Sequence, residues 1–307
     1  MKRFFTLALC TLLLLAALAC GGTPKEKDKP TVVCTIFPQY DFVRQIAGDR
    51  VELIMLVKPG SEVHGFDPSL SEMSLILDSD LFVYVGGETD RWVDDMLKKN
   101  GKDLNAIAIM DLVKTLDEEL APGMQGEAED EPEADEHVWT SPQNAMMIVD
   151  GLTDALCGLL PDEADAMREN AEAYKKELSA LDDDFRTVVR NAKRTTVVFA
   201  ERFPFRYLCD ELGLTYYAAL PGCSSNEEVS LSTVSFLIDR VREEQLPGVF
   251  YIEFSDERIA NTIAEATGVQ TWLLHSCHNV SREDFENGVT YLALMRRNLE
   301  NLKKAVE

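Results

Sequence analysis

The stretch PDEADAMRENAEAYKKELSALDDDFRTVVRNAK, residues 161–193, decides how the rest of the chain can be arranged. Its apolar side chains recur at intervals of three and four residues, at Ala164, Met167, Ala171, Tyr174, Leu178, Leu181, Phe185, Val188 and Ala192. The positions between them are mostly charged, so the pattern predicts one amphipathic helix with a narrow apolar stripe. About 30 residues rise roughly 45 Å, which is longer than one small lobe. A coiled coil has the same period, but the α/β sequence on both sides favours a rigid helix that connects two lobes.

Short apolar runs alternate with helical periodicity on the N-terminal side of this helix. Strands are expected at 31–36, 51–57, 81–86 and 106–110, and helices at 38–47, 68–78, 90–99 and 142–159. Continuously apolar strands that are separated by helices are typical of a parallel sheet covered on both faces. We therefore predict an α/β lobe over residues 31–160.

The same alternation resumes on the C-terminal side of the long helix. Strands are expected at 195–199, 214–218, 248–253 and 270–274, and helices at 204–212, 231–244, 256–267 and 287–306. The predicted fold class is therefore α/β, with two lobes that each hold a roughly four-stranded parallel sheet flanked by helices. The second lobe spans 194–307, and residues 161–193 connect it to the first.

The N-terminus is typical of an export signal. Two basic residues precede a short apolar run that ends in small residues, so residues 1–19 predict a signal peptide. The sequence ALAC at 17–20 is similar to a bacterial lipobox, which would make Cys20 the lipidated first residue of the exported chain. An ordinary secretory signal is the alternative. Residues 20–30 are polar and contain glycine and proline, which predicts a tether.

The chain of 307 residues is strongly acidic, with a formal net charge of −24. Such a charge repels the phosphates of nucleic acid and suits a cationic ligand, although it also serves solubility. The acids are densest in residues 117–136, which hold almost no large apolar side chain. We expect this segment to be a mobile surface loop, because it cannot bury a core.

Three of the four histidines lie in loops that follow predicted strands. His64 and His137 belong to the first lobe, and His275 belongs to the second. Ligands of open parallel sheets bind beyond the carboxyl ends of the strands, so these imidazoles are expected to meet in a cleft between the lobes. Glu201, directly after a strand of the second lobe, is a fourth candidate ligand. Neutral imidazoles with at most one carboxylate favour zinc.

These candidates have alternative interpretations. A single loop histidine is often only a solvated polar residue, and Glu201 could pair with Arg202 or Arg206. His278 is either a further ligand or gate, or a surface residue at a helix start.

The cysteines do not suggest a thiolate zinc site, because none has CxxC spacing. Cys223 and Cys277 lie in predicted loops, where a disulfide between them and free thiols are both open.

Several motifs resemble the zinc- and manganese-specific solute-binding lipoproteins of bacterial ABC importers, the cluster A-I metal-binding proteins. VHGFDPS at 63–69 and DEHVWTSPQNA at 135–145 are similar to two metal-binding segments of that family. FAERFPFRYLCDELGL at 199–214 and GVTYLALMRRNLENLK at 288–303 are similar to two further family segments. The likeness covers nearly all of the mature chain.

The resemblance implies two α/β lobes joined by one long helix, with the metal between them. His64 and His137 match the family's first two ligands. The third ligand position aligns with Ala200, which cannot coordinate, so the neighbouring Glu201 is the expected substitute. The fourth position, usually aspartate, aligns with His275.

The sequence therefore predicts an exported, lipid-anchored protein in the periplasm or on the outer face of the cytoplasmic membrane. We expect a monomer that captures a divalent metal ion, zinc first and manganese second, and delivers it to an ABC permease without catalysis. A zinc-dependent metallohydrolase is a competing class, although no HExxH spacing occurs. A surface adhesin or metal sensor with the same fold is another.

Overall fold

The computed structural model of the chain describes residues 29–63, 65–100, 104–126, 133–222 and 228–307. The predicted signal peptide, Cys20, His64 and Cys223 lie outside these ranges. Within them, no helix combines the length and the apolar composition that a membrane span requires.

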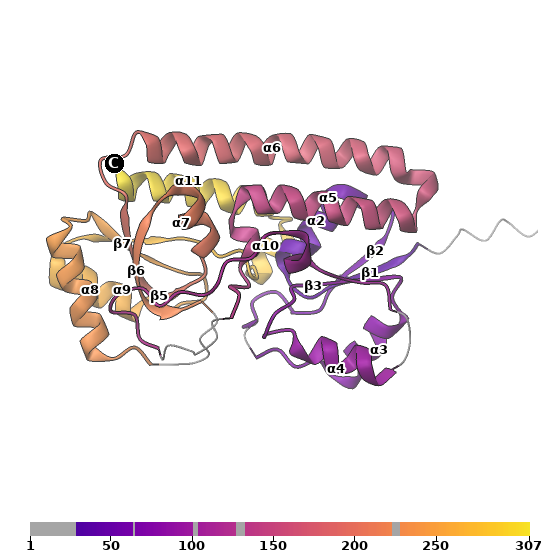
Figure 1. The fold of residues 1–307 in the computed structure, drawn as a ribbon, viewed down its shortest axis with the longest axis horizontal. Helices are drawn as coiled ribbons and strands as arrows, with labels where there is room; N and C mark the ends of the chain where they lie inside the picture. Colours follow the sequence, from indigo (N-terminus) through magenta and orange to yellow (C-terminus); the bar gives the residue numbers. More distant parts are fainter. Residues whose placement is uncertain (1–28, 64, 101–103, 127–132, 223–227) are drawn as a thin grey trace, which may run out of the picture.

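Two parallel sheets of four strands each organise the molecule (Figure 1). The first sheet has the order β2-β1-β3-β4, and the second has the matching order β6-β5-β7-β8. The strands are β1 (Thr31–Cys34), β2 (Glu52–Met55), β3 (Leu81–Tyr84), β4 (Ala106–Ala108), β5 (Thr196–Phe203), β6 (Thr215–Pro221), β7 (Gly248–Tyr251) and β8 (Gln270–Leu273). The prediction of two α/β lobes with one parallel sheet each is confirmed.

Helices flank both sheets. Those of the first lobe are α2 (Phe37–Ala47), α3 (Leu70–Asp78), α4 (Arg91–Asn100) and α5 (Pro142–Leu159), with 3-10 turns at Ile109–Leu112 and Val138–Thr140. Those of the second lobe are α7 (Arg206–Leu212), α8 (Leu231–Glu243), α9 (Arg258–Thr267), α10 (Arg282–Glu286) and α11 (Tyr291–Val306). The sequence pattern does not predict α10, because five residues are too few to show a helical apolar period.

The helix α6 (Ala164–Arg190) is the predicted connection between the lobes, and a 3-10 turn at Pro161–Glu163 precedes it. Its buried face is the apolar stripe of the sequence, with Met167, Leu178 and Phe185 among its members. The helix packs against α2 and α5 of the first lobe and against α7 and α11 of the second (Figure 1). Its 27 residues span about 40 Å, so one rigid element fixes the distance between the lobes.

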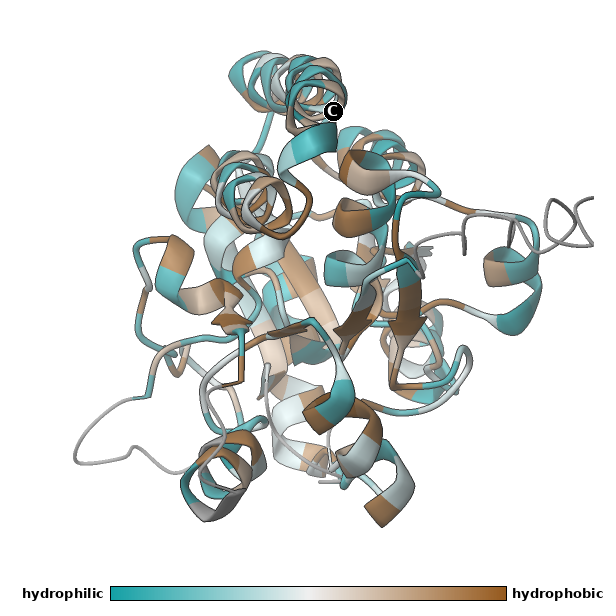
Figure 2. Cartoon of the chain, turned by 90° about the vertical axis from the view of Figure 1, so that its right-hand side faces the viewer, coloured by the Kyte–Doolittle hydropathy of each residue, from teal (hydrophilic) through white to brown (hydrophobic). Residues whose placement is uncertain are grey.

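The hydrophobic core is continuous across the lobes on the side of α6. One cluster of buried side chains runs from β1 and α2 through α5 and α6 to β5 and α11. A second cluster fills the space between the C-terminal sheet and the helices α8 and α9, and a third lies between the N-terminal sheet and α3 and α4. Figure 2 shows strands at the centre of the molecule largely in the brown of apolar residues. Burial of apolar surface therefore joins the lobes on the side of α6.

Strand β5 continues to Phe203, beyond the predicted end at residue 199. After a register shift it still pairs with β6, where Arg202 lies beside Leu220. Glu201 therefore lies inside the strand and not directly after it, which corrects the prediction. The apolar run ends before Glu201, so the hydrophobic pattern alone does not reveal the continuation.

The described parts of the acidic segment 117–136 make contacts that the sequence pattern does not predict. Gln125 donates its backbone N–H to the carbonyl of Ala219 on β6 at 2.9 Å. Ala121 and Asp135 are buried. The described part of the segment therefore reaches the second lobe through a backbone hydrogen bond, which an acidic composition does not exclude.

A polar cluster joins α5, α6 and α7 near the meeting point of the lobes. The Arg186 guanidinium donates to Asp182 at 3.0 Å and to Glu211 of α7 at 2.6 Å, and the Ser141 hydroxyl donates to the other oxygen of Glu211. Burial raises the pKa of Glu211 to about 7, and the neighbouring Asp182 adds to the rise. Burial also acts to raise the pKa of Asp182, but hydrogen bonds with Glu211 and Arg186 outweigh it and lower that pKa. Below neutral pH the proton of this pair therefore resides on Glu211.

Loss of this proton should destabilise the fold. Because the folded-state pKa of Glu211 lies above its ordinary value, its contribution is complete in acid and is lost as the pH rises towards about 7. We expect Glu211→Gln to lessen the fall in stability between about pH 5 and pH 8 by on the order of 2 kcal/mol, after allowance for solvent screening. Thermal unfolding followed by circular dichroism measures this change.

Glu177→Gln is the matched control, because Glu177 also lies on α6 but its side chain is 56% exposed. This variant should keep the wild-type dependence on pH. An equal pH dependence in wild type and Glu211→Gln would contradict the raised pKa.

Candidate metal centre

His137 is fully buried, and it directly follows the acidic segment. Its ring nitrogen Nδ1 lies 3.1 Å from Oδ1 of Asp135, and the same oxygen accepts the backbone N–H of His137 at 2.8 Å. Asp135 is itself buried, and the Tyr207 hydroxyl donates to its backbone carbonyl at 2.6 Å. The carboxylate therefore orients the ring through Nδ1, and Nε2 is the nitrogen that a metal ion would use.

The carboxylates around His137 favour its protonated form. Burial acts to lower the pKa of the ring, but Asp135, with smaller contributions from Glu136 and Glu118, raises it above its ordinary value. Negative surroundings of this kind attract a metal cation as well as a proton. Metal ions and protons would therefore compete at His137.

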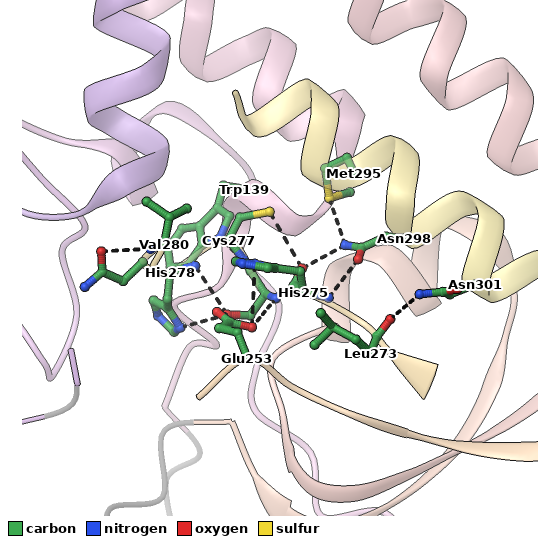
Figure 3. Close-up of polar contacts among 12 residues, drawn as sticks. Trp139, Glu253, Leu273, His275, Cys277, His278, Val280, Met295, Asn298 and Asn301 are labelled. Atoms are coloured by element: carbon green, nitrogen blue, oxygen red, sulfur yellow. Dashed lines mark hydrogen bonds and ion pairs between the residues drawn. The ribbon is translucent and has the colours of Figure 1, made fainter. Parts of the chain in front are cut away.

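The ring that faces His137 belongs to His278, in the loop of residues 275–280 after β8, here the His278 loop. The centroids of the two imidazoles are 4.6 Å apart, and the ring planes meet at 75°. The ring centroids of Trp139 and His278 are 4.7 Å apart, and Figure 3 shows both side chains. The imidazole of His137 from the first lobe and that of His278 from the second therefore lie next to each other.

His275, the ligand predicted for this loop, has a different environment. Its Nδ1 accepts the backbone N–H of Cys277 at 3.0 Å, and the residue is buried. The side-chain amide of Asn298 on α11 bonds both the N–H and the carbonyl of His275 at 2.7 Å each (Figure 3). A ring nitrogen that accepts a hydrogen bond does not offer the same lone pair to a metal. The geometry therefore favours His278 over His275 as the residue that meets a metal beside His137.

Glu253 and the unusual backbone conformation of Cys277 shape the His278 loop, and Phe254 beside Glu253 has a similar conformation. Glu253, just after β7, accepts the backbone N–H of Ser276 at 2.7 Å and also the Ser276 hydroxyl. Cys277 and Phe254 have φ angles of 63° and 60°, in the left-handed region that side chains rarely adopt. Such strain persists only where neighbouring contacts maintain it, and it is common at functional sites. Cys277 itself is buried with a free thiol.

Hydrogen bonds fasten the His278 loop to the first lobe. The side-chain amide of Asn279 donates to the carbonyls of Lys58 and Ser61, each at 2.8 Å. The Trp139 indole donates to the carbonyl of Ser276 at 2.8 Å. The loop that carries His278 is therefore held by residues of both lobes.

A small pocket lies where these elements meet. Its lining comes from Ser61, Glu62 and Val63 in the first lobe and from Arg202, Ile252, Glu253, Phe254, Ser276, His278 and Asn279 in the second. Arg202 of β5 forms an ion pair with Glu62 between the two lobes, at 3.1 Å. A permanent positive charge thus stands in the pocket, and the opposite charge of Glu62 offsets it.

Glu201, the fourth predicted ligand, is not part of this pocket lining. Its carboxylate accepts a hydrogen bond from the Ser255 hydroxyl in the loop after β7. Burial raises the pKa of Glu201, although hydrogen bonds from Ser255 and from the backbone of Ile252 act in the opposite direction. In this arrangement Glu201 supports a loop, and its neighbour Arg202 lines the pocket.

The structure brings together only part of the predicted set of ligands. Among the described residues, no three histidine, cysteine, aspartate or glutamate side chains lie close enough to hold a metal ion. Sequence reasoning missed the roles of Asp135, Glu253 and Arg202. Glu253 stands at a strand end, the position that identified the other candidates, and Asp135 lies two residues before a candidate histidine.

Two α/β lobes, one long connecting helix and a polar site between the lobes define the two-lobed binding proteins. The chain belongs to the family described as "Zinc-uptake complex component A periplasmic", which it matches over residues 32–305.

Characterised relatives agree with this assignment. The zinc-binding lipoprotein AdcA of Streptococcus pneumoniae is 31% identical over 311 residues, which cover 100% of this chain and 62% of AdcA. The high-affinity zinc uptake system protein ZnuA of Bacillus subtilis is 29% identical over 98% of this chain and 96% of ZnuA. The crystal structure of the Zn(II)-bound ZnuA-like domain of AdcA superposes with a TM-score of 0.76 at 29% identity, over 91% of this chain and 99% of that domain. The chain thus spans less than two thirds of the length of AdcA.

Removal of the carboxylate that orients His137 should weaken zinc binding. We expect Asp135→Ala to lower the zinc affinity roughly 10–100-fold, because partners that hold a metal-binding histidine typically contribute that much. Asp135→Asn should lose less, since its amide oxygen still accepts a hydrogen bond from Nδ1. Isothermal titration with zinc, after circular dichroism has confirmed folding, measures both changes. Asp111→Asn is the control, because Asp111 is an exposed acid of the same lobe. If Asp135→Ala bound zinc as tightly as this control, Asp135 would not orient a zinc ligand.

Proposed function

We propose that this chain captures zinc outside the cytoplasm and delivers it to the permease of an ABC importer. The observation that carries the proposal is the pair of imidazoles, His137 and His278, whose centroids lie 4.6 Å apart between the lobes. The names of AdcA and ZnuA, relatives that match almost the whole chain, state zinc binding and zinc uptake. The net charge of −24 also favours a cation as the ligand.

We infer that His64 joins His137 and His278 as a ligand. Glu62 and Val63, the two residues before His64 in the sequence, line the pocket together with His278. Three imidazoles favour zinc, and manganese is the second choice because it prefers oxygen ligands. In this proposal Glu201 and His275, the other two candidates from the sequence, hold the neighbouring loops in place and do not contact the ion.

The location follows from the same relatives. AdcA is a lipoprotein, and the family is described as periplasmic. We therefore infer that residues 1–19 direct export and that Cys20 carries a lipid. The chain then acts as a monomer in the periplasm or on the outer face of the cytoplasmic membrane.

The family consists of uptake components, and we infer that the chain binds and releases its ion without catalysis. A metallohydrolase needs a general base beside an open coordination position. Glu201 and Glu253 are the candidates for such a base. They accept hydrogen bonds from the hydroxyls of Ser255 and Ser276, and these bonds hold loops in place. These contacts support capture and release in preference to hydrolysis.

Release of the ion should proceed by movement of loops and not by a large rotation of the lobes. The shared core around α6 and the hydrogen bonds of Asn279 to Lys58 and Ser61 both resist rotation. Crystal structures with and without zinc test this expectation. A wide hinge opening, in which the contacts of α6 with either lobe are lost, would contradict it.

Zinc titration of single variants tests the function and the ligand set together. The soluble protein from Gly21 onward should bind one zinc ion. His137→Ala and His278→Ala should each lower the affinity at least about 100-fold, more than the loss of a supporting residue costs. His275→Gln should change it less than about tenfold while lowering the melting temperature, because it disturbs a hydrogen-bonded loop.

The outcomes separate the proposals from each other. No zinc binding by the wild type would exclude the function. A loss of zinc affinity in His275→Gln but not in His278→Ala would show that His275, as predicted from the sequence, is the ligand. Parallel titration with manganese decides between the two metals.

A further inference from the structure

The strand β5 carries a guanidinium to the pocket of the candidate metal centre. Arg202 lies near the end of β5, where it is the register partner of Leu220 on β6 after the shift. Its side chain lines the pocket together with His278. A guanidinium cannot be deprotonated in a protein, so this positive charge is not lost by titration. A pocket that suits a divalent cation therefore contains a fixed cation of its own.

The charge of Arg202 opposes the capture of a metal ion. Like charges in one pocket repel each other, and the repulsion grows with the charge of the ion. It is also the reverse of the charge of the chain, which is −24. The presence of an arginine at this place therefore calls for an explanation in terms of the site.

Glu62 provides that explanation, because a carboxylate can bind a guanidinium or a metal ion. Nη2 of Arg202 donates to Oε2 of Glu62 at 3.1 Å, from the second lobe to the first. The other oxygen, Oε1, accepts the backbone N–H of Val63 at 3.1 Å. Carboxylate oxygens are also ordinary ligands of zinc. Since Glu62 and His278 line the same pocket, the carboxylate is near one imidazole of the proposed site.

Glu253, the other carboxylate in the lining of the pocket, is held more firmly. Its Oε2 accepts the backbone N–H of Ser276 at 2.7 Å, and its Oε1 accepts the hydroxyl of the same residue. Its side chain is 8% exposed, whereas that of Glu62 is 50% exposed. An ion pair of a half-exposed carboxylate contributes little net stability, so its exchange costs little. Of these two carboxylates, Glu62 is therefore the one that can change partners.

The coordination preference of zinc leaves a place for this carboxylate. Zinc sites without catalysis usually have four protein ligands, whereas catalytic sites keep one position for water or substrate. The three imidazoles of the proposed function supply three ligands. A carboxylate as the fourth ligand would close the site, which suits capture without catalysis.

We propose that Arg202 and the metal ion compete for the carboxylate of Glu62. Arg202 holds this carboxylate in the pocket, an arriving divalent ion takes it over as a fourth ligand, and Arg202 recovers it when the ion leaves. Glu62 thereby raises the zinc affinity, whereas Arg202 lowers the affinity and speeds release. This inference rests on the proposed function, which requires that the ion be released again.

Zinc titration of single variants tests both roles, after circular dichroism has confirmed folding. We expect Arg202→Gln to raise the zinc affinity about tenfold and to slow the loss of zinc to a chelator by a similar factor, because the competing charge is gone. Glu62→Gln should lower the affinity on the order of 100-fold, since a ligand contributes at least as much as a supporting residue. Arg202→Lys keeps the charge and should stay within about threefold of wild type.

Cobalt(II) in place of zinc gives a second readout, because its visible spectrum changes with the number and kind of its ligands. The spectrum of the cobalt-loaded protein should change in Glu62→Gln, which loses a ligand. It should stay as in wild type in Arg202→Gln, because Arg202 does not contact the ion.

Arg206 and Glu119 form a matched control pair. Their side chains lie 3.0 Å apart and are 20% and 56% exposed, close to the values of 22% and 50% for Arg202 and Glu62. Neither residue of the control pair is in the lining of the pocket. Arg206→Gln and Glu119→Gln make the same changes of charge, and they should leave the zinc affinity within about twofold of wild type.

The direction of the change in Arg202→Gln decides the proposal. An unchanged or lower zinc affinity would assign the ion pair to holding the lobes together and would overturn the competition. An equal rise in Arg202→Gln and Arg202→Lys would attribute the effect to side-chain shape and would also overturn it. A cobalt spectrum of Glu62→Gln identical to that of wild type would show that Glu62 is not a ligand. Failure of the wild type to bind zinc would instead defeat the transport function itself.

Discussion

The apolar stripe of α6 is the interaction on which the rest of the structure depends. Its buried side chains pack against α2 and α5 towards one end and against α7 and α11 towards the other, so one core supports both sheets. Burial of apolar surface contributes about 25 cal/mol per Å², and here that contribution is shared by both lobes. The carboxyl ends of the two sheets therefore stay at a fixed separation, and loops from both can build one site.

The site depends on polar contacts that apolar packing cannot supply. His137 takes its orientation from Asp135, and the His278 loop takes its shape from Glu253 and Asn298. Asp135 and Asn298 are buried, where loss of one hydrogen-bond partner costs about 1–3 kcal/mol. The imidazoles are thus placed by hydrogen bonds within the fold, which is the arrangement that precise binding requires.

Periodicity in the sequence predicts the elements that bury apolar surface. The helix α5 has the predicted bounds, Pro142–Leu159, and the stripe of α6 is the predicted one. The extension of β5 and the contacts of the acidic segment depend on backbone hydrogen bonds between distant residues, which leave no local pattern. The strand-end rule finds the loop that carries His275 and His278 but cannot choose between them. That choice depends on the bond from Cys277 to His275 and on a left-handed backbone at Cys277.

Asn298 makes the candidate metal site dependent on a helix near the end of the chain. It lies on α11, and it holds the backbone of His275 at the start of the His278 loop. Domains generally fold from the N-terminus as the chain emerges, so the first lobe and α6 can form while this loop still lacks its support. At that stage the His278 loop has been made, but its histidines are not yet held in their final positions. The candidate metal site is therefore complete only when α11 has docked.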